Sequence, residues 1–335
     1  MAPAFFVAIT ERVAKAPPIE EQVLALSKVR ADPKSDATRD ALAKALGSKS
    51  NVLAAKAAQL ACELQLACLL PDAEKAFPRF FTDSADKGCV AKNALAETME
   101  SFQSTDESLF LRGVRHVQME GAWGGSTDVA VDLRATCARA LSRLNTKNTL
   151  PALSDLLGDA QAPARAAAAQ AIGHCGRPEG SLPLRLKIRI GDSEPAVMSE
   201  CFAALLTLLG EEAIPLIEPF LSNAKDDFGD AAAMALGESR LAPAYELLRA
   251  RFDREITVDA RQPLLIGIAL SRQPESLDVL LRVIDDEPIP TALQAVAALA
   301  IYKNDPAVST RIRNVIASRH DATLTAEYSK RFERR

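Results

Sequence analysis

Aromatic residues, long apolar runs and paired cysteines are scarce or missing in this chain of 335 residues. Only 5% of the residues are aromatic, and there is one tryptophan, Trp123. No apolar run reaches the roughly 18 residues of a membrane-spanning helix, so we expect no membrane partner. The first residues, "MAPAFFVAITERVAKAPP", have no basic segment before their apolar patch, which favours a packed helix over a signal peptide.

No Cys-x-x-Cys pair occurs among the six cysteines, which lie at positions 62, 68, 89, 137, 175 and 201. Several fall on apolar stripes, as Cys137 does between Leu133 and Leu141. Buried, reduced cysteines behave as small apolar residues and are typical of a reducing compartment. We therefore expect a cytoplasmic protein without disulfides or bound metal.

Common catalytic motifs are also missing. The chain has no G-x-x-x-x-G-K-[ST] phosphate loop, no G-x-G-x-x-G, no H-E-x-x-H and no G-x-S-x-G. None of the three histidines (His116, His174 and His320) directly precedes a glutamate. The net charge of −4 at pH 7 argues against a general nucleic-acid binder. We expect no catalytic residue, no cofactor and no nucleic-acid partner.

What the chain does contain is one segment type that recurs every 29 to 35 residues, with one interval of 46. Small residues are followed by an apolar stripe, as in "APARAAAAQAIGHCG" and "IPTALQAVAALAIYK". The equivalent apolar positions are Leu60, Leu95, Leu141, Ile172, Leu206, Leu236, Leu270 and Leu299. A second helix type, such as "SLDVLLRVI", lies between the copies. A repeated helix–turn–helix unit of this length predicts an α-solenoid.

One copy, "DAQAPARAAAAQAIGHCG", resembles the short HEAT repeat first described in phycobilisome lyases. Asp159, Arg165 and Gly173 occupy the Asp, Arg and Gly positions of that pattern. A looser copy has Arg134 in the Arg position, and the other copies have other residues there: Leu53, Gly88, Ser199, Gly229, Pro263 and Ala292. The resemblance implies a right-handed, all-α solenoid of about eight HEAT-like repeats. It also implies a binding scaffold, in which an arginine such as Arg165 often ties neighbouring units together.

The predicted domain organisation is a single solenoid over residues 1–335. Residues 49–304 would hold the repeats, with a Gly-rich insertion at 119–128, and residues 1–48 and 305–335 would form helical caps. The helices of the first cap are expected near residues 4–15, 18–31 and 36–46.

The interval of 46 residues contains "EGAWGGSTD", which holds Trp123. An insertion of this kind maps to one face of a solenoid, often the binding face. The preceding helix, "ESLFLRGVRHVQ", leaves Arg112, Arg115 and His116 for solvent. Trp123 has two interpretations: an exposed aromatic anchor beside arginines, or a plug that fills a packing gap. Burial of the plug would contribute about 2–3 kcal/mol.

Charge is sorted along the chain. The net charge is +6 over residues 133–190, −9 over residues 191–239 and +4 over residues 306–335. On a solenoid these blocks become charged patches, which have two interpretations. They would set the register of an extended partner, or the charges only cover the solvent-facing sides of the helices.

Together these patterns predict a non-catalytic scaffold or adaptor that binds a protein or peptide along its inner, short-helix face. The candidate partner-binding residues are Trp123, Arg112, Arg115, His116, Arg134, Arg139, Arg143 and Arg165. The alternative is an enzyme-associated HEAT protein, either a bilin-lyase-like subunit or a HEAT-like DNA glycosylase.

Overall fold

The computed structural model describes residues 18–82, 86–222 and 227–333. Over these residues the chain is helical, apart from one two-stranded hairpin. The helix expected near residues 4–15 lies outside the described residues. None of the described helices is long and apolar enough to cross a membrane.

Two compact units make up the chain. The first comprises the described residues up to Leu109 together with Val117–Leu133, and the second comprises Phe110–His116 and Arg134–Arg335. The chain passes from one unit to the other at three points: within α6 (Glu107–Val114), between His116 and Val117, and within α7 (Val131–Leu144).

The first unit is a stack of short helices that carries the hairpin. Its elements are α1 (Ile19–Ser27), α2 (Asp36–Leu46), α3 (Asn51–Glu63), α4 (Leu70–Ala76), α5 (Val90–Ser101), β1 (Met119–Ala122) and β2 (Gly125–Asp128). Helix α3 packs against α1, α2 and α5. Its buried face is mainly alanine, which lets the helix axes approach closely, and Leu60 lies fully buried among them. Helices were expected near residues 18–31 and 36–46, and the structure confirms them.

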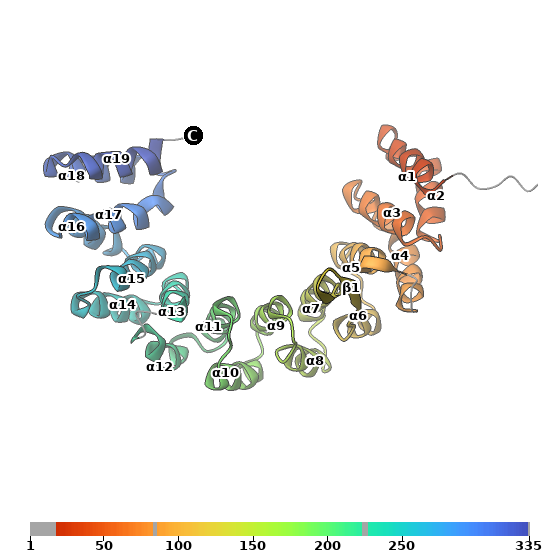
Figure 1. Ribbon diagram of the computed structural model, residues 1–335, viewed down its shortest axis with the longest axis horizontal. Helices are drawn as coiled ribbons and strands as arrows, with labels where there is room; N and C mark the ends of the chain where they lie inside the picture. Colours follow the sequence, from red (N-terminus) through yellow and green to blue (C-terminus); the bar gives the residue numbers. More distant parts are fainter. Residues whose placement is uncertain (1–17, 83–85, 223–226, 334–335) are drawn as a thin grey trace, which may run out of the picture. The chain divides into compact units, whose positions relative to one another are not determined.

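From α8 onward, the second unit consists of two rows of helices (Figure 1). The first row is α9 (Ala162–His174), α11 (Pro195–Leu209), α13 (Asp227–Glu238), α15 (Val258–Ser271), α17 (Ile289–Ala298) and α19 (Ala322–Tyr328). The second row is α8 (Thr149–Leu156), α10 (Ser181–Ile190), α12 (Ile214–Ile217), α14 (Ala242–Arg254), α16 (Ser276–Asp286) and α18 (Pro306–Arg319). Short 3-10 turns interrupt or join the helices of the chain: Lys28–Ala31, Ala67–Leu69, Phe77–Phe81, Lys87–Cys89, Pro178–Gly180, Gly210–Ala213, Glu218–Ser222 and Leu299–Tyr302.

Contacts in the second unit run between neighbours. Along the first row α9 packs on α11, α11 on α13, α13 on α15 and α15 on α17. Across the rows α8 packs on α9, α10 on α11, α14 on α15 and α16 on α17. A unit that buries its apolar face only against adjacent units defines a repeat array. The protein is therefore an all-α, HEAT-like solenoid, as predicted.

The repeating apolar stripe is confirmed, with one correction. All eight predicted copies are helical, and their equivalent leucine and isoleucine positions are buried, except Leu270. In α15 Ile268 is fully buried, whereas Leu270 is half-buried. The correct register of this copy therefore lies two residues earlier than predicted.

Glycine lets two first-row helices meet at their backbones. A Cβ added to Gly237 of α13 would lie 2.3 Å from the carbonyl oxygen of Gly267 in α15. Since no side chain fits in that space, the packing of α13 on α15 requires glycine at position 237.

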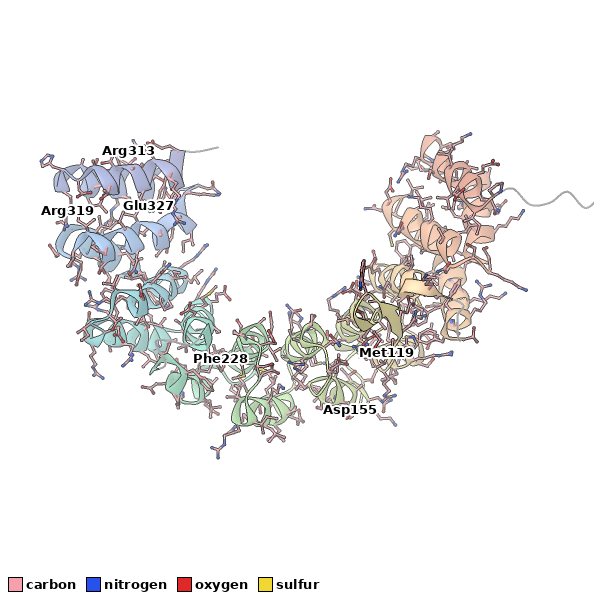
Figure 2. All side chains as sticks on the ribbon, in the orientation of Figure 1. Met119, Asp155, Phe228, Arg313, Arg319 and Glu327 are labelled. Carbon is pink, nitrogen blue, oxygen red and sulfur yellow. The ribbon has the colours of Figure 1, made fainter. Side chains whose placement is uncertain are left out.

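The C-terminal end is fixed by polar contacts to the preceding repeat. Arg319 of α18, labelled in Figure 2, donates hydrogen bonds to the backbone carbonyls of Asp285 and Glu287. Tyr328 of α19 is buried, and its ring stacks on Phe332 at 4.8 Å between centroids. The Arg319 bonds join α18 to the C-terminal end of α16.

Candidate partner-binding surfaces

The insertion at 119–128 is a β-hairpin rather than the irregular Gly-rich loop that the sequence suggested. The antiparallel register pairs Met119 with Asp128 and Ala122 with Gly125, which leaves Trp123 and Gly124 as a two-residue turn. Gly124 has φ of 95°, a left-handed value that glycine adopts without strain. A glycine therefore lies at the turn, where the chain reverses direction.

Trp123 projects from this turn into solvent. Its relative exposure is 106%, the highest of any large apolar residue that the structure describes. The interpretation of Trp123 as a packing plug is therefore wrong: the indole fills no gap within the described part of the chain. A role as a partner anchor stays a prediction.

A polar network holds the base of the hairpin on the first unit. The carboxylate of Asp128 accepts hydrogen bonds from the backbone amides of Gln118 and Ala130, at 3.1 and 3.0 Å. The Gln118 amide nitrogen donates to the carbonyl oxygen of Asp86 at 2.7 Å. Glu120 accepts a bond from the backbone amide of Gly88 at 2.6 Å. This last bond, together with one from Gln118, lowers the pKa of Glu120, so the network retains a carboxylate at neutral pH.

The network continues into a buried ion pair. Asp86 is buried, and its carboxylate accepts bonds from the backbone amides of Ala91 and Lys92 at the start of α5. The Lys92 ammonium lies 3.3 Å from Asp86 and donates to the carbonyl of Phe80 at 2.9 Å. A buried pair with its remaining groups hydrogen-bonded fixes local geometry, and removing one partner is costly. The base of the hairpin is thus held by hydrogen bonds that lead to a buried ion pair.

Three of the predicted residues next to the hairpin in sequence belong to the second unit, whereas Trp123 belongs to the first. Arg112 and Arg115 are exposed, and His116 is half-buried. The carbonyl oxygen of His116 accepts a hydrogen bond from Arg134 at 2.9 Å. Arg112 and Arg115 therefore remain candidates for partner contact within their own unit.

Arg134 is not a partner-binding residue in this structure, and that prediction is wrong. Only 1% of the residue is exposed. Its guanidinium pairs with Asp159, with Nε 2.8 Å and Nη2 3.0 Å from the carboxylate oxygens. Arg139 and Arg143, on the same helix, are exposed and keep their place as candidates. The Arg139 guanidinium donates to the Thr136 hydroxyl at 3.0 Å.

Arg165 also ties one repeat to the next. It donates two parallel bonds of 2.7 Å to the carboxylate of Asp192, which precedes α11. Lys187 lies 2.7 Å from the same carboxylate, and the Asp192 side chain is only 2% exposed. The hydrogen bonds from Arg165 are the main reason that the pKa of Asp192 lies well below its usual value. The linking role implied by the HEAT resemblance fits Arg165 better than partner contact does.

Sequence comparison among the repeats missed a third linking arginine. Arg261 is the fourth residue of α15, as Arg134 and Arg165 are of α7 and α9. It donates to Glu287, before α17, at 2.8 Å, and its guanidinium lies 4.7 Å from the centre of the Phe252 ring. Placing Pro263 in the arginine position followed from the register error at Leu270. We call these residues, Arg134, Arg165 and Arg261 with their acids, the arginine ladder.

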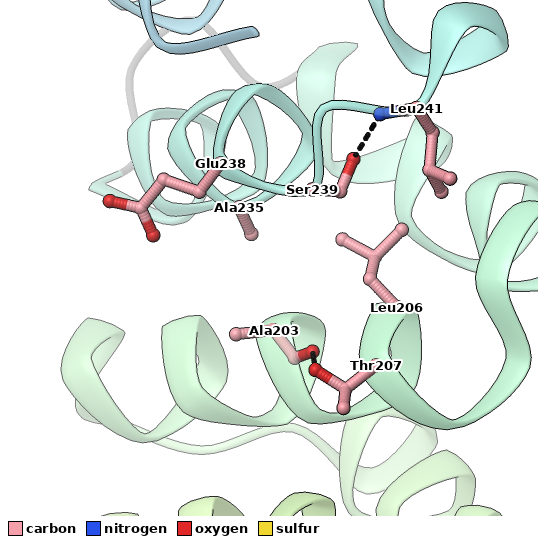
Figure 3. A pocket seen from close by; sticks show the side chains of 7 residues that line it. All are labelled: Ala203, Leu206, Thr207, Ala235, Glu238, Ser239 and Leu241. Atoms are coloured by element: carbon pink, nitrogen blue, oxygen red, sulfur yellow. Dashed lines mark hydrogen bonds between the residues drawn. The ribbon is translucent and has the colours of Figure 1, made fainter.

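A shallow groove lies between the first-row helices α11 and α13 (Figure 3). Its volume is about 350 Å³, and its lining residues are Ala203, Leu206, Thr207, Ala235, Glu238, Ser239 and Leu241. Nearby on α11, burial and the negative charge of Glu238 raise the pKa of Glu200. The groove is small and lined by both polar and apolar groups.

The cysteines offer little reactive thiolate. All six are free, and Cys89, Cys137, Cys175 and Cys201 are buried. Burial raises the pKa of both Cys89 and Cys201 to about 12, so these thiols stay protonated at neutral pH. Among the residues that the structure describes, no three His, Cys, Asp or Glu side chains gather as a metal site.

Comparisons with known proteins give fold likeness only. The chain matches no protein-family model and, in sequence, no curated protein. The phycocyanin lyase complex of CpcE and CpcF from a Nostoc species is similar at a TM-score of 0.40 and 19% identity, over 73% of this chain and 94% of that one. An engineered protein is similar at a TM-score of 0.40 and 14% identity, over 94% of this chain and 95% of that one. Human deoxyhypusine hydroxylase in complex with glycerol is similar at a TM-score of 0.30 and 16% identity, over 85% of this chain and 97% of that one. At these values the likeness carries no conclusion about activity.

Proposed function

We propose that the protein is a non-catalytic scaffold that holds a protein or peptide partner, with Trp123 as an anchor. The observation that carries the proposal is the fully exposed indole at the tip of a hairpin with a rigid, hydrogen-bonded base. Exposing a large aromatic side chain to water is unfavourable, and tryptophan is enriched among the residues that dominate binding energy in interfaces. Holding the turn in place reduces the ordering cost on binding.

The scaffold framework comes from the repeats. Within the second unit, the arginine ladder joins three pairs of neighbouring repeats, through nearly buried ion pairs at Arg134 and Arg165 and a half-buried one at Arg261. These pairs restrain the spacing of the helices that they join. Arg112, Arg115, Arg139 and Arg143 are exposed and supply positive charge for the same class of partner. Charge of one sign on exposed side chains mainly raises the association rate and sets orientation.

Affinity capture from the lysate of the source organism tests the proposal. Wild type is compared with Trp123→Ala and with Thr127→Ala, which truncates another exposed residue of the same hairpin. We expect one protein to be retained by wild type and by Thr127→Ala but lost from Trp123→Ala. Equal retention by all three would refute the anchor role of Trp123.

The alternative, an enzyme-associated HEAT protein, has its own test. A lyase-like subunit would purify with a visible chromophore, and a repair enzyme would be retained on heparin at physiological salt. A colourless protein that passes through heparin would remove both versions.

A further inference from the structure

Helix α10 carries an apolar stripe on its solvent side. Leu182, Leu186 and Ile190 are 67%, 62% and 71% exposed, and their i, i+4, i+8 spacing aligns them along the helix. The buried side of α10 is formed by other residues, Leu184 and Ile188 among them. The stripe is therefore additional to the core packing of this helix.

Other helices of the same row carry polar residues on their solvent side. On α16 the exposed positions include Asp278, Arg282 and Asp285, and on α14 they include Glu246 and Asp253. No large apolar residue on α8, α14, α16 or α18 ranks among the exposed ones in the described chain. The stripe is therefore a property of α10 rather than of the repeat, and exposed apolar patches of this kind mark interaction sites.

A groove runs beside the stripe, between α10, α11 and the segment around α12. Its volume is about 580 Å³, and its lining residues are Arg185, Ile188, Arg189, Leu205, Pro215, Leu216, Pro219 and Phe220. The groove is mainly apolar, and no acidic residue lines it. On the helical wheel Arg185 and Arg189 lie between the groove floor and the apolar stripe, so stripe and groove form one surface.

The two arginines are available for a partner. Both are exposed, and within the described part of the chain neither makes a hydrogen bond or an ion pair. They stand one helical turn apart, where like charges disfavour each other, so a pair of carboxylates would be stabilising there. We call Leu182, Arg185, Leu186, Arg189 and Ile190, together with the groove, the α10 surface.

We propose that the α10 surface binds an acidic amphipathic helix of a partner protein. The apolar side chains of that helix would lie on the stripe and in the groove, and its carboxylates would pair with Arg185 and Arg189. Helix α10 spans ten residues, which equals about 15 Å of helix, or nearly three turns. Helix-in-groove recognition uses apolar anchors over the same length, at i, i+3, i+4 and i+7.

Charge distinguishes this occupant from two others. A second copy docked α10 to α10 would bring two pairs of arginines together, which is repulsive. An anionic membrane would meet the exposed stripe but would leave the recessed part of the groove, at Leu216 and Phe220, unfilled. The acidic helix satisfies the stripe, the groove and the arginines at once.

Display selection with a random library of roughly 14-residue helical peptides tests the proposal. We expect enriched peptides to carry net negative charge and an i, i+3, i+4, i+7 apolar pattern. Their affinity for Arg185→Glu/Arg189→Glu, and separately for Leu186→Glu, should fall about tenfold or more. Arg254→Glu, an exposed arginine on α14, is the matched control and should bind as wild type does. All substituted side chains are exposed, so folding is expected to be unaffected.

Each other outcome would overturn the proposal. These outcomes are no enrichment, enrichment of basic or uncharged peptides, and equal binding to the double variant. Dimerisation that Leu186→Glu abolishes would assign the surface to a second copy. Co-sedimentation with vesicles containing about 30% phosphatidylserine in phosphatidylcholine, lost in the double variant, would assign it to lipid. Because the α10 surface lies in the second unit, this result is independent of Trp123.

Discussion

The arginine ladder predicts that Arg165→Ala destabilises the protein strongly. The substitution removes two 2.7 Å bonds to Asp192 and a 2.9 Å bond to the carbonyl oxygen of Asp159. The Asp192 side chain is 2% exposed and would keep only Lys187 and one backbone amide. Breaking a buried pair by removing one partner costs about 3–5 kcal/mol. Since Lys187 remains, we expect a loss of about 2–3 kcal/mol in the free energy of unfolding.

Urea unfolding followed by far-ultraviolet circular dichroism measures this loss as a shift of the midpoint at unchanged slope. The matched control is Arg311→Ala, which breaks a 2.6 Å ion pair with Asp278 between side chains that are 52% and 61% exposed. An exposed pair contributes about 0.5 kcal/mol or less, so the control should barely move the midpoint. Equal shifts for the two variants would refute the claim that the ladder links the repeats.

The same pair predicts a pH dependence. The hydrogen bonds from Arg165 hold the pKa of Asp192 well below its ordinary 3.8. A carboxyl group whose pKa is lowered by folding contributes stability that is fully present above the pKa of the unfolded chain. This stability is lost as the pH falls toward the lower pKa of the folded protein. Wild type should therefore lose stability more steeply than Arg165→Ala as the pH is lowered from about 4 to 2. Parallel pH profiles would contradict this cause.

Three further predictions follow from packing and exposure. The emission of Trp123 should already be that of a solvated indole in the folded protein and change little on unfolding; a large red shift on unfolding would show a packed indole. Gly237→Ala should destabilise by about 2–4 kcal/mol in thermal unfolding, because its Cβ meets a backbone carbonyl, while Gly121→Ala, with nothing within 4 Å, should change stability little. Similar melting of the two variants would contradict the close approach. Cys68, which is exposed, should react with a maleimide at neutral pH far faster than Cys201, whose thiol is buried with a pKa of about 12; comparable rates would show that the core opens.

The sequence was informative where a pattern repeats. The recurring apolar stripe located all eight helices that carry it, because burial against neighbours demands the same spacing in every repeat. It misplaced one register, at α15, because Leu270 and Ile268 are both apolar and only packing shows which is buried. The linking arginines had a usable signal, namely a recurring separation of 25 to 27 residues between each arginine and its acid.

Surface features were harder to predict. Arg134 was predicted to face a partner because one helix sequence does not show which neighbour covers its first turn. The strands at 119–128 were missed because each is only four residues long and contains a glycine. The stripe on α10 could have been found, since "SLPLRLKIRI" has apolar residues on more than one side of a helix.

Photo-crosslinking from position 123 tests the scaffold proposal most directly. Benzoylphenylalanine replaces Trp123 in one protein and the exposed Gln59 of α3 in a control, and both are irradiated in lysate. If Trp123 is a partner anchor, we expect a discrete crosslink to another protein from position 123 and none from position 59. Crosslinks confined to the chain itself, or the same products from both positions, would contradict it.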